Sequence, residues 1–132
     1  MLRGIILAGL IFIGSMLWLH RILVNGTALQ YLDAHQNPRW VPTAEFYIGK
    51  GYYIFQSLPE AATYFIRIPE RYPTSPYAED AYFNYLETLD DTLGLSRQVL
   101  IEEYQKYLEK YPEGSHASII RDRIDIFRTS GR

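Results

Sequence analysis

Two segments of this chain carry the same Tyr-Pro junction, and they lie 39 residues apart. The first, residues 67–78, reads RIPERYPTSPYA, and the second, residues 106–117, reads KYLEKYPEGSHA. Because proline cannot continue a helix, each junction predicts the end of one helix and a short loop, with a small residue entering the next helix. A single helix pair cannot bury its inner face alone, so the repeat predicts helical hairpins that stack on one another.

Five helices are expected between residues 42 and 128, because apolar patterns of helical spacing alternate there with proline, glycine and serine. No alternating pattern predicts a strand, and the expected fold class is therefore all-α. Pro69 falls in the last turn of the second helix and is expected to kink it. The expected helix starts are marked by prolines in the first turn and by serine caps, at Pro42, Pro59, Pro76, Ser75, Ser96 and Ser115.

This pattern resembles the tetratricopeptide repeat, and in particular its bacterial envelope branch, as in the outer-membrane assembly lipoprotein and the periplasmic cell-division coordinator. Residues 72–78 (YPTSPYA) match the YP-x-S-x-x-A junction of that branch closely, and residues 111–117 (YPEGSHA) match it loosely. The resemblance covers residues 42–128 and implies a short α-α superhelix of such hairpins over a domain at 42–132. The chain holds about two and a half units, fewer than the stand-alone proteins of this kind, so a partner is expected to cover one end.

The N-terminal segment is interpreted as a transmembrane helix over residues 1–24, followed by a polar connector over residues 25–41. Residues 4–19 carry no charge and would extend roughly 24 Å as a helix, somewhat less than the ~30 Å hydrocarbon layer. This interpretation predicts a single-pass inner-membrane protein whose repeat domain lies in the periplasm, although the charges at the two ends do not set an orientation. The alternative is a signal peptide cleaved near Ala28, which predicts a soluble periplasmic protein.

Composition and residue spacing remove several classes of function. The chain contains no cysteine, which excludes disulfides, zinc–thiolate sites, iron–sulfur ligation and thiol catalysis. Beyond residue 28 there are 11 lysines and arginines against 15 aspartates and glutamates, so a nucleic acid partner has no electrostatic basis. The adjacent acids Asp90 and Asp91 point to different sides of a helix, and the histidines do not have the spacing of metal ligands. We therefore expect no enzyme, no cofactor and no metal site.

The expected function is protein binding by a non-catalytic scaffold or accessory subunit, docked through its repeats on a larger membrane or envelope complex. In the tetratricopeptide family, the first helix of each pair lines a concave surface that holds a segment of the partner. By the resemblance, four residues are candidates for that surface: Lys50, Tyr53, Asn84 and Glu87. The alternative for these positions is that Tyr53 belongs to the core and the others are merely solvated.

The last expected helix carries Ile120, Ile124 and Phe127, and it is interpreted either as a cap or as a partner-binding helix. Two other functions remain open alongside the scaffold. One is a cleaved, soluble periplasmic adaptor in envelope assembly. The other, which the absence of any chemical motif disfavours, is a cofactor-bearing or enzymatic accessory protein.

Overall fold

The computed structural model of the 132-residue chain describes residues 2–24, 26–92 and 94–130. Over these ranges the chain forms seven α-helices and no strand, which confirms the all-α class. The contacts divide it into two units, Met1–Asn37 and Pro38–Arg132. Each unit is described by itself below.

The N-terminal unit contains helices α1 (Leu2–Val24) and α2 (Thr27–His35), with Gly26 between them. Gly26 has φ +71°, a left-handed conformation that glycine adopts without steric cost. Helix α2 occupies the segment that was expected to be a polar connector, and it includes Ala28. Among the residues that the structure describes, no helix combines the length and the apolar character that crossing a membrane requires. By that measure the expected transmembrane helix over residues 1–24 is not supported.

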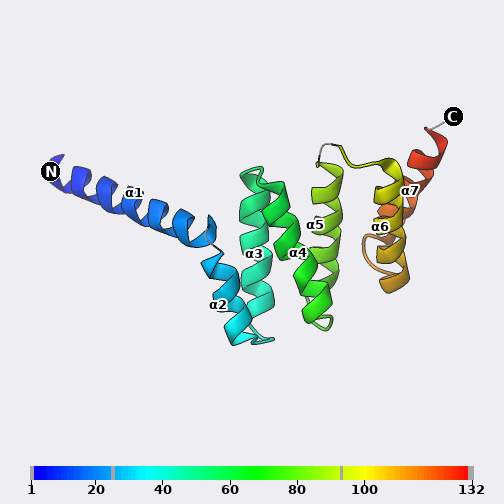
Figure 1. The fold of residues 1–132 in the computed structure, drawn as a ribbon, viewed down its shortest axis with the longest axis horizontal. Coiled ribbons are helices and arrows are strands. Elements are labelled where there is room, and N and C mark those ends of the chain that lie inside the picture. The colour runs from blue at the N-terminus through cyan, green and yellow to red at the C-terminus, as the bar shows by residue number, and fades with distance from the viewer. Residues whose placement is uncertain (1, 25, 93, 131–132) are drawn as a thin grey trace. The chain divides into compact units, whose positions relative to one another are not determined.

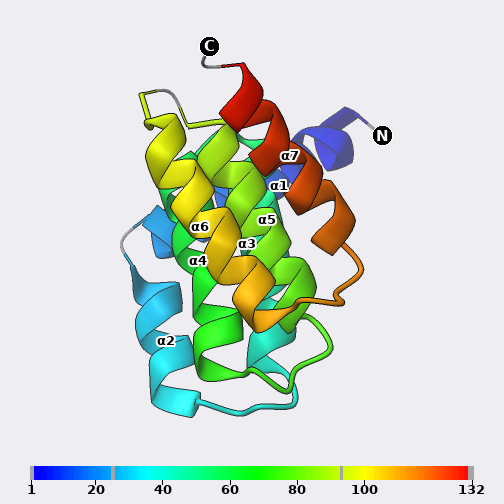
Figure 2. The same ribbon diagram turned by 90° about the vertical axis from the view of Figure 1, so that its right-hand side faces the viewer.

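The C-terminal unit contains helices α3 (Val41–Ile54), α4 (Leu58–Arg71), α5 (Ala78–Asp90), α6 (Arg97–Lys110) and α7 (Ala117–Thr129). Figure 1 shows the chain of this unit reversing direction at each connection. Figure 2 shows the same ribbon turned by 90°, so that α6 and α7 face the viewer. Each helix packs against the next one in the chain, and α3 also contacts α5. The five helices expected between residues 42 and 128 are therefore present, as successive hairpins.

The helix starts agree with the expected caps at only some positions. Ser96 caps α6, because its Oγ accepts a hydrogen bond from the backbone N–H of Val99 at 3.3 Å. The caps expected at Ser75 and Ser115 are wrong, since α5 and α7 begin further along, at Ala78 and Ala117. After each Tyr-Pro pair the backbone closes a tight turn instead, in which the N–H of Ala78 donates to the carbonyl of Ser75 at 3.0 Å.

Helix α4 continues past Pro69 to Arg71, because a proline this close to the end removes little of the hydrogen-bond ladder. The carbonyl of Pro69 accepts a hydrogen bond from Nζ of Lys110 at 2.6 Å. A lysine at the end of α6 therefore satisfies one of the carbonyl groups that the end of α4 leaves without an intrahelical partner.

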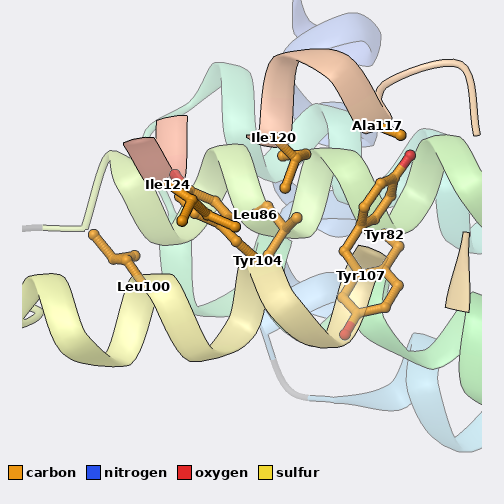
Figure 3. Close-up of a cluster of buried hydrophobic side chains, with 8 residues drawn as sticks. All are labelled: Tyr82, Leu86, Leu100, Tyr104, Tyr107, Ala117, Ile120 and Ile124. Atoms are coloured by element: carbon orange, nitrogen blue, oxygen red, sulfur yellow. The ribbon is translucent and has the colours of Figure 1, made fainter. Parts of the chain in front are cut away.

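Two apolar clusters hold the C-terminal unit together, and α5 contributes to both. The first joins α3, α4 and α5 through Phe46, Ala61, Phe65, Ile68 and Ala81. Figure 3 shows the second, which joins α5, α6 and α7 through Tyr82, Leu86, Leu100, Tyr104, Tyr107, Ala117, Ile120 and Ile124. Gly49 permits the close approach of α3 and α4, since a Cβ there would lie 2.9 Å from Cε1 of Phe65.

Candidate functional site

Helices α3 and α5 each open a hairpin, α7 follows the second hairpin, and each of the three turns one row of side chains away from α4 and α6. On α5 the row recurs at helical spacing and consists of Asp80, Asn84, Glu87 and Asp91. The same spacing gives Thr43, Tyr47, Lys50 and Ile54 on α3, and Ile119, Arg123, Ile126 and Ser130 on α7. All of these side chains are exposed or half-buried, and we refer to the twelve together as the α3/α5/α7 face.

One hydrogen bond fixes α3 beside α5 at the ends of the two helices. The hydroxyl of Tyr53 donates to Oδ2 of Asp91 at 2.5 Å. This hydrogen bond, with burial and the nearby carboxylates of Asp91, Glu87 and Asp90, raises the pKa of Tyr53 to about 12. Tyr53 is thus half-buried next to the α3/α5/α7 face, and its hydroxyl is used within the chain.

Arg123 fixes α7 beside α5 through two ion pairs and a ring contact. Its Nη2 lies 2.5 Å from Oε1 of Glu87, and its Nη1 lies 2.6 Å from Oδ2 of Asp90. The guanidinium also lies over the ring of Phe83, with Cζ 5.7 Å from the ring centroid. Asp90 accepts a further hydrogen bond from the hydroxyl of Tyr104 on α6. This network holds the rows of α5 and α7 at a fixed separation.

The carboxylate of Glu79 organises the connection between α6 and α7. Its Oε1 accepts hydrogen bonds from the hydroxyls of Tyr107 and Ser115, both at 2.9 Å, and from the backbone N–H of His116 at 3.4 Å. Burial would raise the pKa of Glu79, but these hydrogen bonds outweigh burial and lower it below 4.5. A Cβ at Gly114 would lie 2.5 Å from Oε1 of Glu79, so a larger residue there would displace this carboxylate.

The lowered pKa of Glu79 predicts a loss of stability in acid. A carboxyl group whose pKa is depressed by folding stabilises the fold above its unfolded pKa, and that contribution disappears as the pH falls through the folded pKa. Replacement of Glu79 by glutamine is expected to lower the free energy of unfolding by roughly 1–2 kcal/mol at pH 7, where its charged hydrogen bonds are lost. It is also expected to flatten the decline of stability below pH 4.5.

Urea unfolding followed by circular dichroism at pH 7, 5, 4 and 3 measures both effects. The control is Glu109→Gln on α6, an exposed carboxyl group that should leave the curves unchanged within about 0.5 kcal/mol. Equal acid sensitivity of the wild type and the Glu79→Gln variant would contradict the role given to Glu79.

Three of the four candidate surface residues lie on the α3/α5/α7 face. Lys50 is exposed, with its Nζ 5.5 Å from the ring centroid of Phe46. Asn84 is half-buried and donates to the carbonyl of Asp80 at 2.7 Å. Glu87 is half-buried and forms the ion pair with Arg123. Whether a partner touches them stays a prediction.

The interpretation of Ile120, Ile124 and Phe127 as partner-binding residues needs correction. Ile120 is 0% exposed and Ile124 is 6% exposed, because both belong to the cluster that joins α5, α6 and α7. Phe127 packs against the same cluster and stacks on Tyr104 with ring centroids 5.9 Å apart. Ile120 and Ile124 are thus used in the protein's own core, whereas for the half-buried Phe127 contact with a partner stays a prediction.

The outer side of α7, where a further hairpin would stack, is charged. On α5 the side that meets α6 carries Tyr82, Leu86 and Leu89, which are buried or half-buried. The corresponding residues 39 positions later are Arg121, Asp125 and Arg128, all exposed. Between α6 and α7 this end has a pocket of about 360 Å³, lined by Gln105, Leu108, Arg121, Ile124, Asp125 and Arg128. A charged outer side is the property of a capping helix, and such an end needs no partner to shield it from water.

The sequence interpretation did not single out the exposed apolar side chains of the α3/α5/α7 face. These are Tyr47 and Ile54 on α3 and Ile119 and Ile126 on α7, with exposed fractions of 62%, 72%, 43% and 57%. They have the same spacing along their helices as the acidic residues on α5. This shared spacing can be recognised only when the buried side of each helix is known. Among the described side chains, no group of three or more His, Asp or Glu residues is placed to hold a metal ion.

Comparison of the chain with protein-family models, with curated proteins and with solved structures finds no match. No relative therefore indicates a ligand or a partner for the α3/α5/α7 face. What this face binds has to be inferred from its own charges, exposed side chains and rigidity.

Proposed function

We propose that the protein is a non-catalytic, tetratricopeptide-like scaffold or accessory subunit that binds another protein on the α3/α5/α7 face. The observation that carries this proposal is the set of exposed apolar side chains on that face, Tyr47, Ile54, Ile119 and Ile126. Exposed apolar side chains that gather on one surface, rather than scatter singly, are typical of interaction sites. The charged end of α7 offers a partner less apolar contact.

The rigidity of the face supports the same proposal. Tyr53 holds α3 to α5 through Asp91, and Arg123 holds α7 to α5 through Glu87 and Asp90. Because these contacts exist before a partner arrives, binding costs little ordering of the surface. The resemblance of the Tyr-Pro junctions to tetratricopeptide repeats favours the same surface.

We also propose that α1 anchors the protein in the inner membrane, with the repeat domain in the periplasm. Helix α1 has 23 residues, which corresponds to about 34 Å. From Gly9 to Leu19 every described side chain is exposed, including Leu10, Ile11, Phe12, Ile13, Met16, Leu17, Trp18 and Leu19. A helix that is apolar on all sides needs lipid or another protein around it. The alternative is a soluble periplasmic adaptor released by cleavage near Ala28.

Purification of the tagged full chain in a mild detergent tests the protein-binding proposal. A stoichiometric partner is expected to co-purify with the wild type and to be lost from the double variant Ile119→Asp/Ile126→Asp. The control is Val99→Asp on α6, because Val99 has the same exposed fraction as Ile119, 43%, but lies off the α3/α5/α7 face. A chain that elutes alone and monomeric would contradict the scaffold proposal, and equal loss of the partner in both variants would contradict the choice of face.

The anchor is tested separately by alkaline extraction of membranes and by determination of the mature N-terminus. An anchored chain remains in the membrane pellet and retains α1. A chain that begins at Leu29 and is found in the soluble fraction would replace the anchor with the cleaved adaptor.

A further inference from the structure

We infer that the partner of the α3/α5/α7 face is a basic amphipathic protein segment, whose lysines or arginines lie along α5 and whose apolar side chains contact α3 and α7. This inference rests on the proposed function, because it names the chemistry of the partner at the same surface. The inference adds two properties of the partner, its charge and its apolar pattern, which both follow from the three rows of the face.

The row on α5 is acidic at three of its four positions, Asp80, Glu87 and Asp91. Of these, only Glu87 is paired with a lysine or arginine, namely Arg123. Asp80 contacts the imidazole of His116 at 3.0 Å, and Asp91 accepts from the hydroxyl of Tyr53. Among the described residues, the carboxylates at the two ends of the middle row are therefore left without a lysine or arginine paired to them.

The cations near this row do not compensate for these two acids. Arg123 is already shared between Glu87 and Asp90. Lys50, on the row of α3, lies over the ring of Phe46. The exposed Asp122 stands on α7 between the levels of Ile119 and Ile126 and adds another negative charge at the edge. The twelve residues of the face carry three acids and two cations, but all three acids stand on the α5 row and both cations on the flanking rows, so the complementary charge for a basic partner lies along α5.

Each of the two rows beside α5 carries two exposed apolar side chains. Helix α3 contributes Tyr47 and Ile54, and α7 contributes Ile119 and Ile126. On α7 these isoleucines stand where α5, 39 residues earlier, has Asp80 and Glu87, so acid is confined to the middle row. A segment that matches all three rows carries a basic stripe with apolar residues on both sides.

Charge argues against other occupants. A second copy of the chain carries the same net charge of −2 and the same acidic row, so two such faces repel. The arginines at the end of α7 alternate with Asp125, and Arg121 is already bonded to the carbonyl of Pro112 at 2.5 Å. Nucleic acid and anionic lipid head groups are repelled by the acids of α5.

Fluorescence anisotropy with three synthetic peptides tests the inference on the full chain in a neutral detergent. The peptides are 16-residue helices that share one leucine pattern and carry lysine, glutamine or glutamate at the remaining positions. We expect the lysine peptide to bind at least tenfold more tightly than the other two, with an affinity that falls as salt is added. The double variant Asp80→Asn/Asp91→Asn is expected to weaken it at least fivefold, while keeping the acceptor oxygens for His116 and Tyr53.

The matched control is Glu102→Gln/Glu109→Gln, which removes two exposed carboxylates from α6, away from the face. It is expected to change the affinity of the lysine peptide by less than twofold. Equal weakening by both double variants would mean that net charge alone attracts the peptide, and the inference would be overturned. Binding of the glutamine or glutamate peptide as tight as that of the lysine peptide would overturn it as well.

The co-purified partner separates failure of this inference from failure of the proposed function. If the partner is lost from Ile119→Asp/Ile126→Asp but unaffected by Asp80→Asn/Asp91→Asn and by excess lysine peptide, the protein-binding face stands and a basic partner is ruled out. If the partner is retained by Ile119→Asp/Ile126→Asp, the face itself is wrong. If the lysine peptide displaces the partner and the glutamine and glutamate peptides do not, the result supports both the proposed function and this inference.

Discussion

Replacement of Arg67 by methionine is expected to lower the free energy of unfolding by roughly 3–5 kcal/mol, one of the two largest effects predicted for this protein. Nε of Arg67 on α4 lies 2.8 Å from Oε1 of Glu45 on α3, and the Glu45 side chain is 0% exposed. Methionine keeps most of the apolar contact of the arginine but removes the guanidinium that lies 2.8 Å from a fully buried carboxylate. The cost therefore comes from the buried charge and not from a cavity.

Urea unfolding of the full chain in mild detergent, followed by circular dichroism, measures this loss. The control is the double variant Glu45→Met/Arg67→Met, which removes both charges and is expected to recover most of the stability. The coupling between the two sites is the difference between the double variant and the sum of the single variants. A loss below 1 kcal/mol for Arg67→Met would show that water or another group neutralises Glu45.

Replacement of Leu86 by alanine is expected to cost roughly 2–5 kcal/mol, because a fully buried side chain is lost from the second cluster. Leu86 is 0% exposed, and it packs among α5, α6 and α7 (Figure 3). The cavity cannot close easily, since the rings of Tyr104 and Tyr107 around it are themselves 0% exposed. The same unfolding measurement gives the value.

The repeat supplies a matched control for Leu86. Asp125 occupies the corresponding position 39 residues later, on the exposed outer side of α7. Asp125→Ala is expected to change the free energy of unfolding by less than about 0.5 kcal/mol, because the Asp125 side chain is exposed. A cost for Asp125→Ala as large as that for Leu86→Ala would show that the end of α7 is covered and not a cap.

The hairpins themselves could be predicted from the sequence. The two Tyr-Pro junctions and the apolar spacing between them predicted five helices, and Ser96 was identified correctly as a cap. Local rules were sufficient there, because proline and capping act within a few residues of the chain. The rules were insufficient at Ser75 and Ser115, where the tight turn after each junction takes the place of a serine cap.

The partners of charged side chains could not be predicted in the same way. Glu45 and Arg67 lie on different helices 22 residues apart, and Arg123 reaches Asp90 across 33 residues. The spacing of residues within one helix cannot predict ion pairs between helices, because such pairs depend on which helices pack together. The same limit explains why the sequence predicts Ile120 and Ile124 as contact residues although they belong to the core.

By itself the sequence determined that the chain is helical and that its hairpins repeat at the Tyr-Pro junctions. The absence of cysteine excluded thiol-based sites, and the excess of acidic residues gave no electrostatic basis for a nucleic acid partner. These properties depend on local conformational preference and on composition, both of which are written along the chain. Only the tertiary structure decided which side of each helix is buried, and so separated the charged end of α7 from the α3/α5/α7 face. That decision depends on packing between helices, because an apolar residue is core or contact surface according to the neighbours that cover it.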